Sequence, residues 1–156
     1  PMTRVPYLVL GDGTVIAETM AICRYFEAVQ PEPSLFGRTA LEQGVIEMWQ
    51  RRVEQGLLAP VAHAFRHRHP RMAHLEVPQV AEWGEANVPK VEAMLDLLNR
   101  ELERRAYIAG EQFSVADITA LCTIDFMKVA RFSLADRHEN LKRWHETASA
   151  RPSAQA

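Results

Sequence analysis

The sequence predicts an α+β fold that is mainly helical, in which a β-hairpin and one helix precede a bundle of helices. Two short apolar runs flank Gly11-Asp12-Gly13, a turn typical of a hairpin. From Ile22 onward, apolar residues recur at helical spacing. Pro31 and Pro33 interrupt that pattern, and the longer apolar stripes after them again have a helical period.

The N-terminal part is predicted to form two strands and a helix. The strands are expected at residues 7–10 and 15–17. Pro6 stands at the start of the first strand. Because proline has no N–H, it leaves the backbone of Val5 free to pair with another extended chain. Thr19 stands where a helix N-cap belongs, so its hydroxyl is expected to accept a hydrogen bond from a first-turn N–H.

The rest of the chain predicts helices with recognisable ends. Thr39 and Glu42 have the spacing of a capping box and begin a helix with a long apolar stripe. Gly56 and Pro60 predict a kink in this helix rather than two separate helices. Three later helices are expected: one after Pro78 with a bend at Pro89, one from Ser114, and one that includes Leu141 and ends before Pro152.

These elements divide the chain into three parts. Residues 1–30 hold the hairpin and its helix, residues 31–38 form a stiff linker, and residues 39–156 form an all-helical domain. A length of 156 residues is enough for one domain with a buried core and part of another.

Composition fits a globular chain and argues against several classes of partner. The chain is 47% hydrophobic and 24% charged, with a formal net charge of −2, whereas nucleic-acid binding normally requires a basic face. Cys23 and Cys122 both lie in apolar helical patterns, so we expect core packing in a reducing compartment rather than a disulfide. No apolar run approaches the roughly 20 residues that span a bilayer, and no signal peptide is visible. We therefore expect a cytoplasmic protein without a membrane or nucleic-acid partner.

The corner formed by Glu18 and Thr19 is the strongest candidate binding site. A helix start favours an anion, because its first N–H groups are unpaired and its dipole is positive there. Glu18, just before the helix, can pair with an ammonium group. Together with the free backbone of Val5, this corner fits a small zwitterionic peptide. Taken singly, each feature also fits ordinary structure, namely a strand that starts with proline and a helix cap.

The order of these features resembles the second half of the thioredoxin-like, glutathione-binding domain of glutathione transferases, in particular bacterial-type cytosolic members. The resemblance is carried by Arg4-Val5-Pro6, the hairpin, Glu18-Thr19-Met20-Ala21-Ile22 and Tyr25-Phe26. It implies a cis Val5-Pro6 bond and a valine backbone that pairs with the cysteinyl part of glutathione. It also implies that Glu18 and Thr19 hold the γ-glutamyl group. Arg4 occupies the polar position before Val-Pro and is a further candidate for glutathione binding.

A second, distant motif resembles the same family. Phe113-Ser114-Val115-Ala116-Asp117-Ile118 is a capping box in which Ser114 is the cap and Asp117 reaches back to it. By itself the box indicates only a well-started helix. In glutathione transferases such a box begins a buried helix at the centre of the all-helical domain. The resemblance covers essentially the whole chain, and Pro6, Ser114 and Asp117 are expected to be structural residues within it.

The resemblance implies a homodimeric transferase that conjugates the glutathione thiolate to a small hydrophobic electrophile, as in detoxification. Glutathione is then the co-substrate, and no metal is expected. The family's activating hydroxyl or cysteine belongs to a β-α-β unit expected before Pro1, so no residue here is assigned the catalytic role. Two alternatives stay open: a non-catalytic binding or assembly module on the same scaffold, and a glutathione-dependent reductase or peroxidase.

Residues of the helical part are expected to complete the site. In the resemblance, Arg52 or Glu54 could approach glutathione in the same or the facing subunit, although such charges usually form a solvated helix face. A hydrophobic substrate cleft between the domains is expected to be lined by Met48, Trp49, His63 and Phe126.

Two further patterns are weaker. His63 and His67 have the i, i+4 spacing of metal ligands, but without a third ligand in the pattern we expect ordinary polar or cleft-lining histidines. Asp125, in an apolar helix, is expected to be a buried carboxylate with a partner, in a structural or a functional role.

Overall fold

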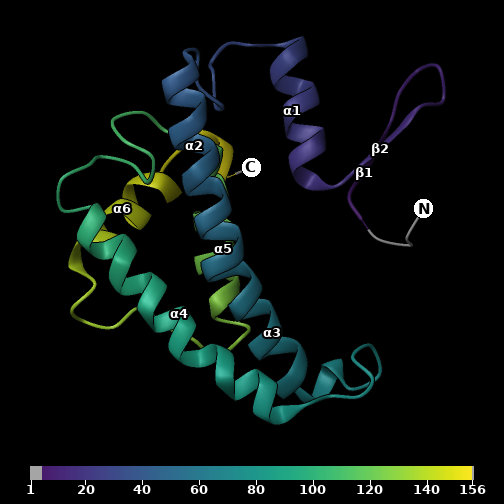
Figure 1. Ribbon diagram of the computed structural model, residues 1–156, viewed down its shortest axis with the longest axis vertical. Coiled ribbons are helices and arrows are strands. Elements are labelled where there is room, and N and C mark those ends of the chain that lie inside the picture. The colour runs from purple at the N-terminus through teal and green to yellow at the C-terminus, as the bar shows by residue number, and fades with distance from the viewer. Residues whose placement is uncertain (1–4, 156) are drawn as a thin grey trace.

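The computed structural model describes residues 5–155 and confirms the mainly helical α+β fold. Strand β1 (Tyr7–Val9) pairs antiparallel with β2 (Val15–Ala17), with Leu8 opposite Ile16. Gly13, at φ +85°, closes the turn, where a residue with a side chain would be strained. Helix α1 (Thr19–Val29) follows directly and lies between the hairpin and the bundle (Figure 1).

Helix α2 (Ala40–Val53) begins at the predicted capping box. The Glu42 N–H donates to Thr39 Oγ1 at 3.2 Å, and the Thr39 N–H donates to Glu42 Oε2 at 3.1 Å. The helix continues through a π-helical turn, η1 (Glu54–Leu58), into α3 (Ala59–Arg68) without leaving helical backbone angles. Pro60 has no N–H for the carbonyl four residues earlier, and the wider π turn is where the helix adjusts. The predicted single, interrupted helix is confirmed.

The remaining helices begin and end close to their predicted signals. Helix α4 (Ala81–Glu101) contains Pro89 and packs along α3, while α5 (Val115–Met127) and α6 (Glu139–Ser149) complete the bundle (Figure 1). Two short 3₁₀ turns, η2 (Pro70–Met72) and η3 (Pro152–Ala154), follow α3 and α6. One core joins α2, η1, α3, α4, α5 and α6, and its largest members include Trp49, Leu57, Leu95, Leu98, Met127, Leu141 and Trp144.

The capping box of α5 lies inside this core, as the sequence predicted. Ser114 is the N-cap, and its N–H and hydroxyl both donate to Asp117 Oδ2, at 2.9 and 3.0 Å. The other carboxylate oxygen accepts from the Ile108 N–H and from the Trp144 indole N–H, each at 2.9 Å. Asp117 therefore connects α5 to the preceding loop and to α6.

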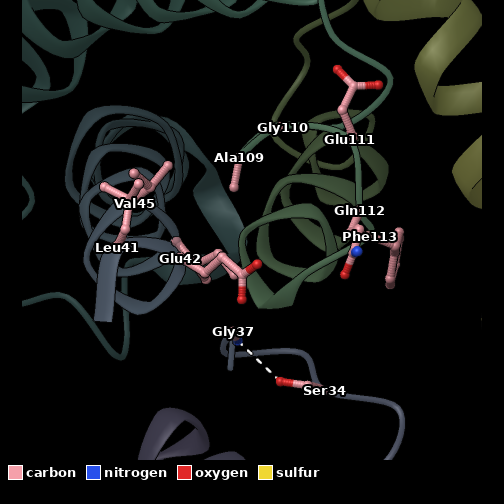
Figure 2. A pocket seen from close by; sticks show the side chains of 11 residues that line it. Ser34, Gly37, Leu41, Glu42, Val45, Ala109, Gly110, Glu111, Gln112 and Phe113 are labelled. Atoms are coloured by element: carbon pink, nitrogen blue, oxygen red, sulfur yellow. Dashed lines mark hydrogen bonds between the residues drawn. The ribbon is translucent and has the colours of Figure 1, made fainter. Parts of the chain in front are cut away.

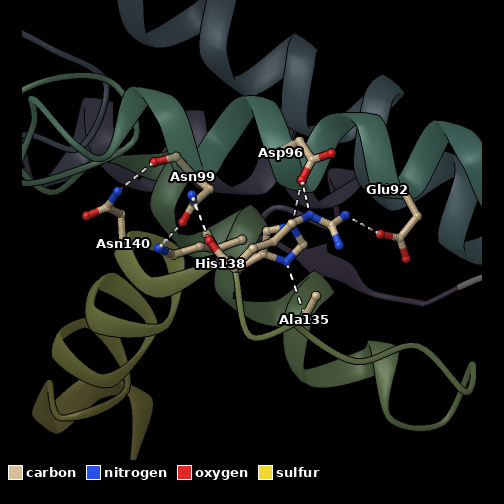
Figure 3. A network of polar contacts seen from close by, with 8 residues as sticks. Glu92, Asp96, Asn99, Ala135, His138 and Asn140 are labelled. Atoms are coloured by element: carbon tan, nitrogen blue, oxygen red, sulfur yellow. Dashed lines mark hydrogen bonds and ion pairs between the residues drawn. The ribbon is translucent and has the colours of Figure 1, made fainter.

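A polar cluster fastens the start of α6 to α4 (Figure 3). The buried ring of His138 accepts the Ala135 N–H at Nδ1, so its Nε2 carries the proton and donates to Asp96 Oδ1 at 2.8 Å. Arg137 donates to the same Asp96 oxygen and to Glu92. The hydrogen bond from Arg137, followed by that from His138, lowers the pKa of Asp96 below its usual value.

The segment between α1 and α2 is held by hydrogen bonds at Leu35 and Phe36. The Glu27 carboxylate accepts N–H groups of Leu35 and Phe36 at 3.1 and 3.2 Å, and the Leu35 carbonyl accepts the Val115 N–H at 3.0 Å. Arg24 also forms an ion pair with Glu47 across α1 and α2. These contacts fix α1 against the helical part.

Two expectations about α5 were wrong. Cys122 is exposed rather than packed in the core, and Cys23, on α1, is only partly buried. Asp125 is also exposed, with 55% of its side chain accessible, and it pairs with His145 Nε2 at 2.8 Å. Both residues lie on the side of α5 that the other helices leave open, which an almost wholly apolar helix does not reveal from its sequence.

None of the helices within residues 5–155 combines the length and the apolar character needed to cross a membrane.

Candidate functional site

The start of α1 differs from the predicted cap. Glu18, not Thr19, is the N-cap residue, and Thr19 is the first residue of the helix. Glu18 adopts φ +71° and ψ 123°, and no side chain caps the first turn. The prediction that the Thr19 hydroxyl caps the helix was wrong. The helix begins one residue earlier than predicted, with Glu18 as the N-cap at a positive φ, so Thr19 already lies inside the helix. The first-turn N–H groups are consequently open to a ligand.

A cavity of about 520 Å³ lies beside this helix start, between α1, α2 with η1, and α5. Glu18, Thr19 and Met20 form its α1 side. The α2, η1 and α5 sides carry several polar groups and consist of Gln50, Arg51, Glu54, Leu58, Ile118, Thr119, Cys122 and Thr123. A volume of this size is in the range of about 300–1,000 Å³ that is typical of small-molecule sites.

Charges of both signs line the cavity. Arg51 and Glu54 form an ion pair, with Arg51 Nη2 2.6 Å from Glu54 Oε2, so these two charges partly neutralise each other. Glu18 forms no ion pair within residues 5–155; its side chain is exposed and lines the cavity. Arg52, which was expected to approach the site, instead lies over the Trp49 ring with its guanidinium carbon 4.8 Å from the centroid. Of the predicted pair, Glu54 faces the cavity and Arg52 does not.

The residues expected to form a hydrophobic cleft are not brought together around this cavity. Trp49 does not line a cleft as expected, because it is only 2% exposed and belongs to the core face of α2. Met48 is exposed on α2, His63 lies against Trp83 with ring centroids 5.7 Å apart, and Phe126 packs edge-on against Phe65 at 5.2 Å.

A second cavity, of about 300 Å³, lies between the start of α2 and the segment before α5. Figure 2 shows Leu41, Glu42 and Val45 on one side and Ala109 to Phe113 on the other. The Glu42 carboxylate is already occupied by the N–H groups of Arg38 and Thr39. Because the Glu42 carboxylate already accepts the hydrogen bonds of the helix cap, this cavity offers less to a charged ligand than the cavity beside Glu18.

The two spaced histidines do not form a metal site in the described structure. His67 Nδ1 accepts the Val80 N–H at 3.0 Å, and its Nε2 faces Glu76 at 3.6 Å. No group of three or more metal-ligating side chains occurs within residues 5–155.

The N-terminal motif has the backbone that the resemblance implied. The Val5-Pro6 bond is cis, and Val5 is exposed just before β1. Arg4, the remaining candidate, lies outside the described residues.

Comparison with known proteins gives the family. Residues 58–152 match the family model for the C-terminal domain of glutathione S-transferase. Glutathione S-transferase 2 of Saccharomyces cerevisiae is 38% identical over 150 residues, which cover 96% of the chain and 64% of that protein. The chain belongs to the glutathione S-transferase family. The crystal structure of Gtt2 from Saccharomyces cerevisiae is similar throughout, with a TM-score of 0.93 and 37% identity over 97% of this chain and 74% of that one.

The glutathione S-transferase scaffold is also found in proteins with other names. Probable elongation factor 1-gamma 1 of Arabidopsis thaliana is 29% identical over 97% of this chain, which corresponds to 36% of that protein. The chain thus spans 64% of the yeast relative and about a third of the plant one.

The cavity residues that the sequence analysis missed include Gln50, Thr119, Cys122 and Thr123. A signal for Gln50 existed, since it stands between Trp49 and Val53 on an otherwise apolar stripe. A polar side chain buried at such a place needs a partner, and Thr119 on α5 provides it.

Proposed function

We propose that this chain supplies part of the glutathione site of a glutathione transferase. Glu18 and Thr19 hold the γ-glutamyl group, and the backbone of Val5 pairs with the cysteinyl group. The observation that carries the proposal is the φ of +71° at Glu18, beside a cavity. Such backbone angles are unfavourable for a residue with a side chain, and they concentrate at binding sites, where the surroundings fix them.

The chemistry of this corner suits the two charges of the γ-glutamyl group. The uncapped first turn of α1 offers N–H groups to the α-carboxylate, and the carboxylate of Glu18 offers a partner to the ammonium. In the full-length enzyme, the glutathione thiolate would form a carbon–sulfur bond with a small hydrophobic electrophile such as a chloronitrobenzene, from which chloride leaves. No residue between 5 and 155 is assigned to activate the thiol.

Glu18→Gln in the full-length protein tests this assignment. The substitution keeps the size of the side chain and removes the charge. Because Glu18 is exposed, we expect a loss in glutathione affinity of about 1 kcal/mol, or roughly five-fold. Calorimetric titration with glutathione measures the affinity, and a melting curve separates it from stability. Glu103→Gln, at another exposed carboxylate, is the matched control. Unchanged affinity in Glu18→Gln, or no binding by the parent, would refute the proposal.

A non-catalytic assembly module is the second candidate, since the chain is also similar to an elongation factor 1-gamma. The two candidates differ in turnover. A transferase consumes glutathione and chloronitrobenzene with release of chloride, whereas a module that only binds glutathione shows no turnover above the uncatalysed rate.

A further inference from the structure

Gln50 is a buried amide that faces the cavity beside Glu18. It lies on α2, is 1% exposed, and lines the cavity together with Thr19 and Met20. Its position between the helical bundle and the start of α1 allows it to act on a ligand bound at Glu18.

Hydrogen bonds fix the orientation of the Gln50 amide. The Thr119 hydroxyl donates to Gln50 Oε1 at 2.9 Å, so the amide oxygen is turned to α5 and the NH₂ group is turned to α1. Thr119 is itself held on α5, where its carbonyl accepts the Thr123 hydroxyl at 2.6 Å. The side chain of Gln50 is therefore set with its donor toward the start of α1.

The donor has only a weak partner there. Gln50 Nε2 lies 3.2 Å from Met20 Sδ, and a thioether is a poor acceptor. Its second N–H has no hydrogen-bond partner within residues 5–155. Buried polar groups are normally paired, and a buried amide donor beside a cavity whose one partner is a thioether has room for a stronger acceptor from a ligand.

The surroundings select the kind of acceptor. The uncapped first turn of α1 and the Gln50 NH₂ both offer N–H donors at this cavity. Glu18 can take a cation, because the other carboxylate, Glu54, is already paired with Arg51. A group with a carboxylate and an ammonium attached to the same carbon, as in an α-amino acid, matches this arrangement.

We infer that Gln50 donates a hydrogen bond to the α-carboxylate of the γ-glutamyl group, and that Thr119 is a positioning residue that holds the amide in this orientation. The inference rests on the proposed glutathione site. It adds that α2 and α5 of the helical part bind the same head group as α1.

Two ligands and three variants of the full-length protein test the inference. The ligands are glutathione and 4-aminobutyryl-cysteinyl-glycine, which lacks the α-carboxylate. Gln50→Leu keeps the volume and removes the donor. It should weaken glutathione binding about 10- to 100-fold, the range for a hydrogen bond to a charged group. The parent should bind 4-aminobutyryl-cysteinyl-glycine more weakly than glutathione. In Gln50→Leu this difference in affinity between the two ligands should be smaller, by the same 10- to 100-fold factor.

Thr119→Val should show the same ligand-specific pattern with a smaller loss, because the amide stays but is free to turn. Gln55→Leu, an exposed glutamine of η1, is the matched control and should bind both ligands as the parent does. Melting curves report whether each variant is folded. If Gln50→Leu does not fold, Thr119→Val decides the question.

The outcomes separate the two claims. A parent that does not bind glutathione refutes the proposed site and this inference with it. A parent that binds, together with folded Gln50→Leu or Thr119→Val that binds both ligands with parental affinity, refutes only the role of Gln50.

Discussion

Asp117 is the residue on which several segments of the helical part depend. Its two oxygens accept hydrogen bonds from the Ser114, Ile108 and Trp144 N–H groups, and the side chain is fully buried. Burial raises the pKa of Asp117 above its usual value, and the hydrogen bonds from these groups oppose that rise. Loss of the carboxylate leaves buried donors from three segments without an acceptor.

We predict that Asp117→Ala lowers the free energy of unfolding by at least about 3 kcal/mol, because each unpaired buried donor costs about 1–3 kcal/mol. Chemical denaturation of the two proteins measures the difference. Asp125→Ala removes an exposed carboxylate from the same helix and should cost less than about 1 kcal/mol. Equal losses in the two variants would mean that the network around Asp117 contributes no special stability.

Single residues also show what sequence could and could not predict. The boxes at Thr39 and Ser114 were correct, because each interaction spans three residues and depends on local spacing. The cap at Thr19 failed, because nothing in the local sequence encodes the positive φ of Glu18. The exposure of Cys122 depends on which side of α5 the other helices leave open, and that is decided by packing between distant segments.

At the scale of elements, α3 and α4 pack closely together at Gly84. A Cβ added at Gly84 would meet Arg68 Cγ at 2.6 Å and His67 Cβ at 3.2 Å. These atoms are near the α3 backbone and cannot move far. A Cβ added at Gly44, within α2, would meet nothing within 4 Å.

We therefore predict opposite signs for the same substitution in two helices. Gly44→Ala should stabilise the protein by up to about 1 kcal/mol, the gain in helix propensity. Gly84→Ala should destabilise it by about 1–2 kcal/mol, because the forced shift of α3 outweighs that gain. Thermal unfolding of both variants checks the signs. A more stable Gly84→Ala would show that the two helices can separate at little cost.

The cluster between α4 and α6 makes stability depend on pH. The folded pKa of Asp96 is below its usual value of 3.8, so the unfolded state takes up protons first as the pH falls. The contribution of Asp96 is fully present above pH 3.8 and is lost as the pH falls through the lower folded pKa.

Asp96→Asn should accordingly be less stable than the parent at neutral pH, and the difference should shrink toward zero below pH 3.8. Denaturation curves at several pH values measure it. Asp136→Asn, at a fully exposed carboxylate paired with Lys142, is the control and should follow the parent at every pH. A difference between Asp96→Asn and the parent that persists unchanged into acid would contradict the role of the Asp96 charge.

Elements were easier to predict than the site they form. Apolar period, prolines and caps are local signals, and they placed all six α-helices within the described residues. The cavity joins α1, α2 and α5, which are far apart in the chain, and the set of residues that lines it could not follow from periodicity within any one helix.

At the scale of the whole molecule, α2 presents two different apolar faces. The apolar stripe predicted for this helix is largely used inside the chain, because Trp49 and Val53 are in the core. Leu41 and Met48 are exposed, and their separation of seven residues places them on one outer face of the helix. This outer face is the apolar part of α2 that the core does not use.

We predict that the full-length protein is a homodimer with two-fold symmetry whose seam includes Leu41 and Met48. In such an interface a substituted residue is present twice, once in each subunit. Met48→Glu should therefore raise the dissociation constant at least about ten-fold, as expected for loss of an interface anchor. Sedimentation equilibrium at micromolar concentration measures it, with Val129→Glu, at an exposed apolar residue after α5, as the control. A monomeric parent would contradict the dimer, and a Met48→Glu variant as tightly paired as the parent would contradict this seam.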